Sequence, residues 1–143
     1  MHIGRNFMLA GLVFFMQAIP TAALAEGTPA TPVEKAKVVS RLYQATYGAQ
    51  LRCGASPEWA THGKTLERFR STYPELIQLV DSSPYLPAAK ESFQGFLLAN
   101  PPSKVSEKNL TLECESLESI LRSLIDGPGA REAVAGYVQL LKS

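Results

Sequence analysis

The chain has 143 residues, of which 45% are hydrophobic, and a formal net charge of +1. A chain of this length is large enough for one domain with a modest core. Because its charge is close to zero and no run of basic residues occurs, the composition lacks the electrostatic footprint of proteins that bind nucleic acid or anionic lipid. We therefore expect no nucleic-acid partner.

The first 25 residues have the pattern of a cleaved signal peptide. A short start with one cation, Arg5, precedes an apolar run at 7–19, and the sequence Ala-Leu-Ala at 23–25 matches a signal-peptidase site. A transmembrane anchor is the alternative, but the run is shorter than the roughly 20 residues that span a bilayer. We expect cleavage after residue 25 and a periplasmic or secreted protein without a membrane anchor.

Cleavage of the signal peptide would change the composition and the net charge of the mature chain. Arg5, all three methionines and one of the two histidines would be lost, which leaves a formally neutral chain with His62 as its single histidine. Residues 26–31 are rich in small residues and predict a flexible leader, followed by a single helical domain at 32–143. With so few soft or imidazole ligands, we expect no cofactor and no metal site.

The first helix is predicted from Pro32 to about Cys53. Thr31 and Glu34 have the spacing of a capping box, and proline suits the first helical position. The apolar residues then recur at helical spacing up to the cysteine. Gly48 is the weak point of this helix.

The second helical segment is expected to begin with Ser56 as its capping residue and Pro57 at its first position. Its apolar stripe continues to Val80 and passes through Pro74. Two outcomes fit this pattern: one helix that is kinked at the proline, or two shorter helices with a break near Tyr73.

Three more helices are expected in the second half of the chain. One runs from about Leu86 to Ala99 and ends at the strongest break, the sequence Asn-Pro-Pro-Ser at 100–103. The most regular amphipathic helix follows at 106–125, and the last begins after a glycine C-cap and proline in the sequence Asp-Gly-Pro-Gly. The apolar stripe of the 106–125 helix consists of Leu110, Cys114, Leu117, Leu121 and Leu124. Because alternation of the β type is absent, the predicted fold is all-α, a small bundle or orthogonal array of about five helices.

The two cysteines, Cys53 and Cys114, lie on the apolar stripes of different helices. An even number of cysteines in an exported protein predicts a disulfide. A redox or metal-binding thiol pair is the alternative, but the sequence has no Cys-x-x-Cys and one mature histidine. We therefore expect one disulfide that cross-links the bundle.

The connector 52–64 gathers the candidate partner-binding residues, Arg52, Trp59, His62 and Lys64. Trp59 and His62 are three residues apart, so on a helix they share a face. An exposed aromatic residue among polar groups can anchor a protein partner. The alternative, which the pattern favours, places Trp59 over the end of the bundle beside the disulfide and His62 in water.

Glu113, Glu115 and Glu118 are expected on the solvated face of the 106–125 helix, where Glu118 can pair with Arg122. Acid–base catalysis by two carboxylates needs them to converge on one cleft from different environments. Neither a nucleophile elbow nor a glycine-rich phosphate loop occurs. We therefore assign no catalytic residue and do not expect an enzyme.

The function that fits the sequence best is a non-catalytic exported protein that binds another exported protein, as inhibitors and immunity proteins do, an argument from architecture. A periplasmic chaperone or acid-stress protein is one alternative, although the mature chain lacks the methionines that adaptable binding surfaces use. A carrier of a small apolar ligand is the other. Its pocket would be lined by Phe69, Tyr73, Phe93 and Phe96.

Overall fold

The computed structural model describes residues 29–143, so the expected signal peptide at 1–25 and part of the leader at 26–31 lie outside the described residues. The described elements are α2 (Pro32–Tyr43), the π-helical η2 (Gln44–Gly48), α3 (Ala49–Cys53), α4 (Trp59–Thr72), α5 (Pro74–Asp81), α6 (Leu86–Ala99), the 3₁₀ turn η3 (Pro102–Lys104), α7 (Glu107–Asp126) and α8 (Ala130–Lys142). Since α2, η2 and α3 are continuous, this part of the chain forms six helices and no strand, which confirms the all-α prediction. Within residues 29–143, no helix combines the length and the apolar character needed to cross a bilayer.

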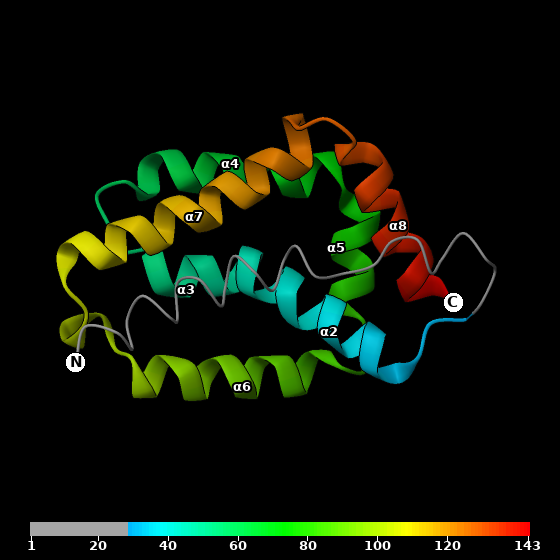
Figure 1. Ribbon diagram of the computed structural model, residues 1–143, viewed down its shortest axis with the longest axis horizontal. Helices are drawn as coiled ribbons and strands as arrows, with labels where there is room; N and C mark the ends of the chain where they lie inside the picture. Colours follow the sequence, from blue (N-terminus) through cyan, green and yellow to red (C-terminus); the bar gives the residue numbers. More distant parts are fainter. Residues whose placement is uncertain (1–28) are drawn as a thin grey trace.

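The continuous helix α2–η2–α3 runs through the middle of the molecule (Figure 1). On one side of it α4 and α7 lie against each other, and α6 packs against α2 on the other side. One end is closed by α5 and α8, which pack together. The central helix therefore carries some of the most buried side chains, Val38, Val39 and Leu42.

The start of the central helix is the capping box that the sequence predicts. Glu34 N–H donates to Thr31 Oγ1 at 3.2 Å, and Thr31 N–H donates to the Glu34 carboxylate at 2.8 Å. Gly48, the predicted weak point, lies at the end of the π-helical turn, where a Cβ atom would be 3.0–3.3 Å from the ring of Phe93 in α6. The missing side chain therefore allows α6 to approach the central helix closely.

The second segment is broken, not kinked. Tyr73 has φ −127° and ψ 57° and separates α4 from α5, which begins with Pro74. A residue before proline is disfavoured in the helical region by contact with the proline ring. The break at Tyr73 is thus one of the two outcomes that the sequence left open.

The predicted start of α4 is wrong by two residues. Trp59 is the first helical residue, and Ser56 lies in the preceding turn, where its Oγ accepts from Glu58 N–H at 3.3 Å. The turn is held by a hydrogen bond from Ser56 N–H to the Cys53 carbonyl at 2.9 Å. The chain uses these residues to reverse direction after α3, so α4 begins later than its capping signal suggests.

The end of α7 also differs from the expected glycine cap. Gly127 occupies the C-cap position but is extended, with φ −71° and ψ 158°, because it precedes Pro128. The left-handed residue is Gly129, with φ 73°, which is the N-cap of α8. The predicted boundary is correct, while the left-handed turn falls two residues later.

The predicted disulfide joins Cys53 of α3 to Cys114 of α7, with 5.9 Å between the two Cα atoms. Both cysteines are 1% exposed and form a small core of their own with Ala49 and Leu117. The larger core lies between α2 and the helices around it. Of the predicted α7 stripe, Cys114, Leu117 and Leu121 are buried, and Leu110 and Leu124 are partly buried.

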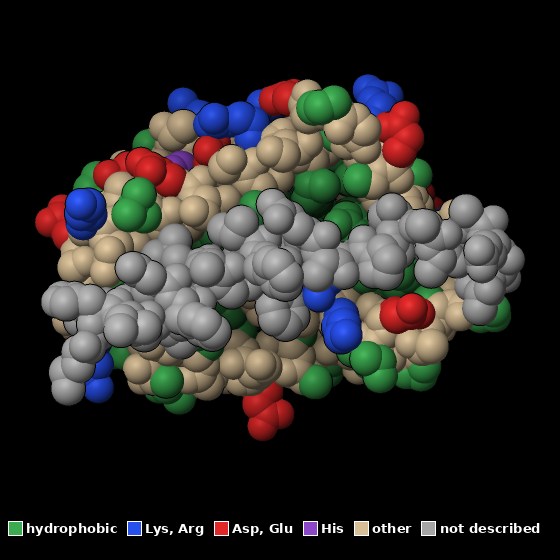
Figure 2. Space-filling view, in the orientation of Figure 1, with side chains coloured by type: hydrophobic (Ala, Val, Ile, Leu, Met, Phe, Trp, Pro, Cys, Tyr) green, Lys and Arg blue, Asp and Glu red, His purple; other side chains and the backbone are tan. Residues whose placement is uncertain are grey.

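Charged side chains of both signs are interspersed along the edge formed by α4 and α7 in the face that Figure 2 shows. Arg68 and Asp126, one from each helix, form an exposed ion pair there at 3.0 Å. This mixture agrees with the near-zero charge of the chain. Exposed pairs of this kind contribute about 0–1 kcal/mol to stability.

Candidate functional site

The four residues proposed from the sequence as partner-binding do not form one surface. Lys64 is exposed and Trp59 is partly buried, packing against the disulfide core as the alternative interpretation expected. Arg52 and His62 are buried, at 4% and 8% exposure. The expectation that His62 is in water is wrong, because it lies on the same face of α4 as Leu66, one turn away, which is buried in the core.

Arg52 is part of the scaffold. Its Nε donates to both carboxylate oxygens of Glu113 at 3.2 and 3.3 Å, and its Nη2 donates to Glu113 Oε2 at 3.1 Å. Its Nη1 donates to the Asn100 carbonyl, and its guanidinium lies 5.2 Å from the ring centroid of Phe96. Arg52 thereby connects the end of α3 to α7 and to the end of α6.

Two of the three glutamates expected in water are buried. Glu113 is buried because Arg52 supplies its counter-charge, and Glu118 accepts a hydrogen bond from Thr65 Oγ1 at 2.8 Å. Glu118 also forms the predicted ion pair with Arg122, and Glu115 is exposed as expected. The three carboxylates have separate partners or surroundings and do not converge on one cleft.

The aromatic residues proposed to line an apolar pocket are divided between two packed pairs. Phe69 and Tyr73 are in edge contact, with ring centroids 5.3 Å apart, and Phe93 and Phe96 are tilted against each other at 5.6 Å. Phe69 is fully buried and Phe93 is 6% exposed. These rings fill the core, and Tyr73 also lines a hollow in the surface, described next.

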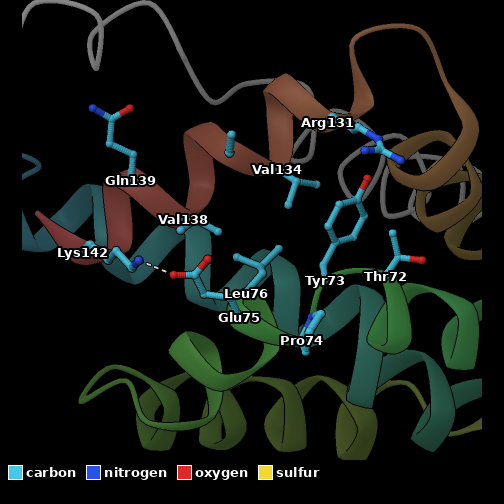
Figure 3. Close-up of a pocket in the computed structure, with 11 residues that line it drawn as sticks. Thr72, Tyr73, Pro74, Glu75, Leu76, Arg131, Val134, Val138, Gln139 and Lys142 are labelled. Carbon is cyan, nitrogen blue, oxygen red and sulfur yellow. Dashed lines mark ion pairs between the residues drawn. The ribbon is translucent and has the colours of Figure 1, made fainter.

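A groove of about 720 Å³ lies between α5 and α8, and we call it the α5–α8 groove (Figure 3). Its floor is apolar, with Leu76 of α5 facing Val134 and Val138 of α8. Tyr73 and Arg131 mark one end, and an ion pair between Lys142 and Glu75 marks the other.

Local sequence features explain why the groove forms. Arg131, Val134, Ala135, Val138 and Lys142 follow helical spacing, so they present one face of α8. The break at Tyr73 lets α5 leave the direction of α4 and lie against α8. The Tyr73 hydroxyl donates to the Leu124 carbonyl of α7 at 2.6 Å, which fixes the ring at the end of the groove.

The two ends of the groove differ in charge. Lys142 and Glu75 neutralise each other, and both are more than half exposed, so their pairing is weak and screened. Arg131 is exposed and forms no ion pair with any residue in 29–143. The groove therefore offers an apolar floor with an uncompensated cation at one end.

A second hollow of about 380 Å³ adjoins the groove at Pro74, which lines both, and we call it the Arg70 hollow. Its other lining residues are Arg70, Ile77, Gln78, Asp81 and Ser82. Beside it, the Tyr47 hydroxyl donates to the Asp81 carboxylate at 3.0 Å, and the Arg70 guanidinium lies 4.7 Å from the Tyr47 ring centroid. Burial raises the pKa of Tyr47, and the hydrogen bond to Asp81 and its negative charge raise that pKa further.

Neither hollow could be found from the sequence. Arg131 and Arg70 are ordinary charged residues on helical surfaces, and their positions become informative once the packing of α5 is known. No group of three or more His, Cys, Asp or Glu residues that could hold a metal ion occurs within residues 29–143.

Comparisons with protein-family models, curated proteins and solved structures give no significant match to this chain.

Proposed function

We propose that this protein is an exported, non-catalytic binding protein, of the inhibitor or immunity type, that holds another exported protein in the α5–α8 groove. The observation that carries the proposal is the apolar floor of Leu76, Val134 and Val138 with Arg131, which has no ion-pair partner among the described residues, at one end. Protein interfaces concentrate their binding energy in apolar anchors and arginines of this kind.

The energetics favour a partner that presents an apolar side chain next to an acidic one. Full burial of a leucine or phenylalanine side chain contributes about 1.5–3 kcal/mol. A carboxylate placed against Arg131 would add a charge-assisted hydrogen bond and would set the orientation of the partner. The groove is not an enclosed cavity, which suits a segment of a protein, whereas a carrier encloses most of the surface of its ligand.

Export is part of the proposal. The disulfide between Cys53 and Cys114 is of a kind that persists in oxidising compartments such as the periplasm. The signal-peptide pattern at 1–25 points the same way.

The test is site-specific photo-crosslinking in the native compartment. A photoreactive amino acid is placed at Ala135, which is exposed in the groove, or at Ala88, which is exposed on α6 and serves as the matched control. One exported protein should crosslink in stoichiometric amount from position 135 and not from position 88. Arg131→Glu, combined with the probe at 135, should abolish that crosslink because it reverses the charge that meets the partner's acid.

Three outcomes would contradict the proposal. Equal crosslinking from both positions would show that the groove is not the contact surface. Many unrelated crosslinked clients would indicate a chaperone, and a small molecule that co-purifies and is displaced by Ala135→Arg would indicate a carrier.

A further inference from the structure

Arg70 has an unused binding edge. Its Nε and Nη2 atoms are enclosed by protein and have no hydrogen-bond partner within the described residues. These two nitrogens lie on the same edge of the planar guanidinium, the edge that binds the two oxygens of a carboxylate at once. Buried donors left unpaired destabilise a protein, and charged ones do so more strongly, so an acceptor bound at this edge would be favourable.

The surroundings hold this arginine close to an acid without letting the two neutralise each other. The Tyr47 ring lies against the guanidinium, while its hydroxyl holds the Asp81 carboxylate at 3.0 and 3.2 Å. No ion pair joins Arg70 to Asp81 in the described chain, although both line the same hollow. The hollow therefore presents a positive and a negative group that are both able to bind a ligand.

The remaining walls define the rest of the ligand. Pro74 and the partly buried Ile77 supply apolar contact. Gln78 is exposed and its side chain makes no hydrogen bond within residues 29–143, so no such bond has to break if it moves when a ligand binds. The volume of about 380 Å³ is at the low end for small-molecule sites.

We propose that the Arg70 hollow binds a zwitterionic amino acid with an apolar side chain. Its carboxylate accepts hydrogen bonds from Nε–H and Nη2–H of Arg70, and its ammonium group donates to the lone pairs of the Asp81 oxygens that the Tyr47 hydroxyl does not occupy. The side chain packs against Pro74 and Ile77. This site is separate from the α5–α8 groove, and the proposal does not depend on a protein partner.

The test compares leucine with two analogues that each lack one charged group. The probes are L-leucine, 4-methylpentanoate, which lacks the ammonium group, and 3-methylbutylamine, which lacks the carboxylate. The readout is the ¹⁵Nε–¹H resonance of Arg70 in the purified protein, assigned through bonds from its own backbone amide. Leucine should shift this resonance in a saturable manner, and each analogue should bind at least about tenfold more weakly, which corresponds to 1.4 kcal/mol.

Two variants separate the roles of the charged groups. Arg70→Lys keeps the charge but loses the two-donor edge, so it should abolish leucine binding, measured by calorimetry. Asp81→Asn should weaken leucine to the level of 4-methylpentanoate and leave 4-methylpentanoate unchanged. Arg68→Lys, exposed on the same helix but outside the hollow, is the matched control and should bind leucine like the unaltered protein.

The proposal is overturned if leucine gives no saturable shift of the Arg70 resonance. It is also overturned if leucine binds no more tightly than 4-methylpentanoate, or if Arg131 responds in the same way as Arg70. These three measurements use the unaltered protein, so they do not depend on whether a variant folds.

Discussion

Arg52 connects three parts of the backbone through one buried guanidinium. Its nitrogens donate to the Glu113 carboxylate of α7 and to the Asn100 carbonyl after α6, and its face lies over Phe96. Burial of an ion pair is costly, and the attraction between the charges offsets that cost when the remaining donors are also satisfied. The arrangement thus favours one particular docking of α3 on α7 over other packings of the same helices.

The first prediction concerns Glu113. Glu113→Gln should lower the free energy of unfolding by about 3–5 kcal/mol, because it leaves the charge of Arg52 buried without a counter-charge. Glu115→Gln, two residues along the same helix but exposed, is the matched control and should change stability by less than about 0.5 kcal/mol. Urea denaturation of both variants measures the difference. Equal stabilities would show that the buried pair contributes nothing specific.

The buried charges also show where sequence reasoning fails at the scale of single residues. Glu113 lies on the polar side of an amphipathic pattern, and its partner Arg52 is on another helix far along the chain. The local pattern reports the mean polarity of a helix face, whereas burial of one carboxylate depends on a counter-charge brought there by the fold. His62 was misplaced for a different reason: its spacing of four residues from Leu66 puts it on the buried face of α4.

At the scale of elements, the π-helical turn η2 is where the central helix receives an aromatic ring from α6. Gly48 ends this turn, and a Cβ atom there would be 3.0–3.3 Å from three carbons of the Phe93 ring. Phe93 in turn packs edge-on against Tyr43 of the central helix at 5.9 Å. Glycine at position 48 therefore leaves the space that the Phe93 ring of α6 occupies.

The second prediction compares two glycines in helices. Gly48→Ala should destabilise the protein by about 1 kcal/mol, because overpacking against Phe93 outweighs the gain in helix propensity. Gly95→Ala, in α6, is the matched control and should stabilise by about 0.5–1 kcal/mol, since nothing lies within 4 Å of its added Cβ. Denaturant midpoints measure both changes. Stabilisation of both variants would mean that the Phe93 ring can shift to make room for the added Cβ without loss of stability.

The helices were predictable because each has a strong apolar period and most are bounded by proline or glycine, which act locally. Thr31 is the N-cap that its sequence signal predicts, and Ser106 is an N-cap with a hydrogen-bonded side chain at the start of the expected 106–125 helix. The late start of α4 depends on the turn that follows Cys53, and the groove depends on how α5 lies against α8. Those features arise from packing between distant segments, which no local period encodes.

At the scale of the whole molecule, the disulfide encloses a large part of the fold. Cys53 and Cys114 are 61 residues apart, so α4, α5 and α6 all lie within the covalent loop. The chain-entropy model gives a stabilisation of about 4 kcal/mol for a loop of this length. That is a large share of the roughly 5–15 kcal/mol typical of a domain.

The third prediction is that removal of the disulfide lowers the melting temperature clearly. Because both cysteines are 1% exposed, the bridge is reduced in denaturant and the protein is refolded before calorimetry. The double variant Cys53→Ser with Cys114→Ser should melt lower than the native protein and should not respond further to reductant. A reduced protein with an unchanged melting temperature would contradict the prediction, as would free thiols in the denatured, unreduced protein.

The covalent loop also determines how the molecule would transmit a mechanical load. Ala30 N–H donates to Ser143 Oγ at 3.0 Å, so the two ends of the described chain meet beside α2 and α8. Tension applied to these ends passes directly from Cys53 to Cys114 and bypasses α5. Pulling would peel α8 away and split the α5–α8 groove between its two walls. The residues that line the Arg70 hollow, all within 70–82, lie between the two cysteines, inside the loop that the disulfide closes. Their backbone would therefore carry no tension.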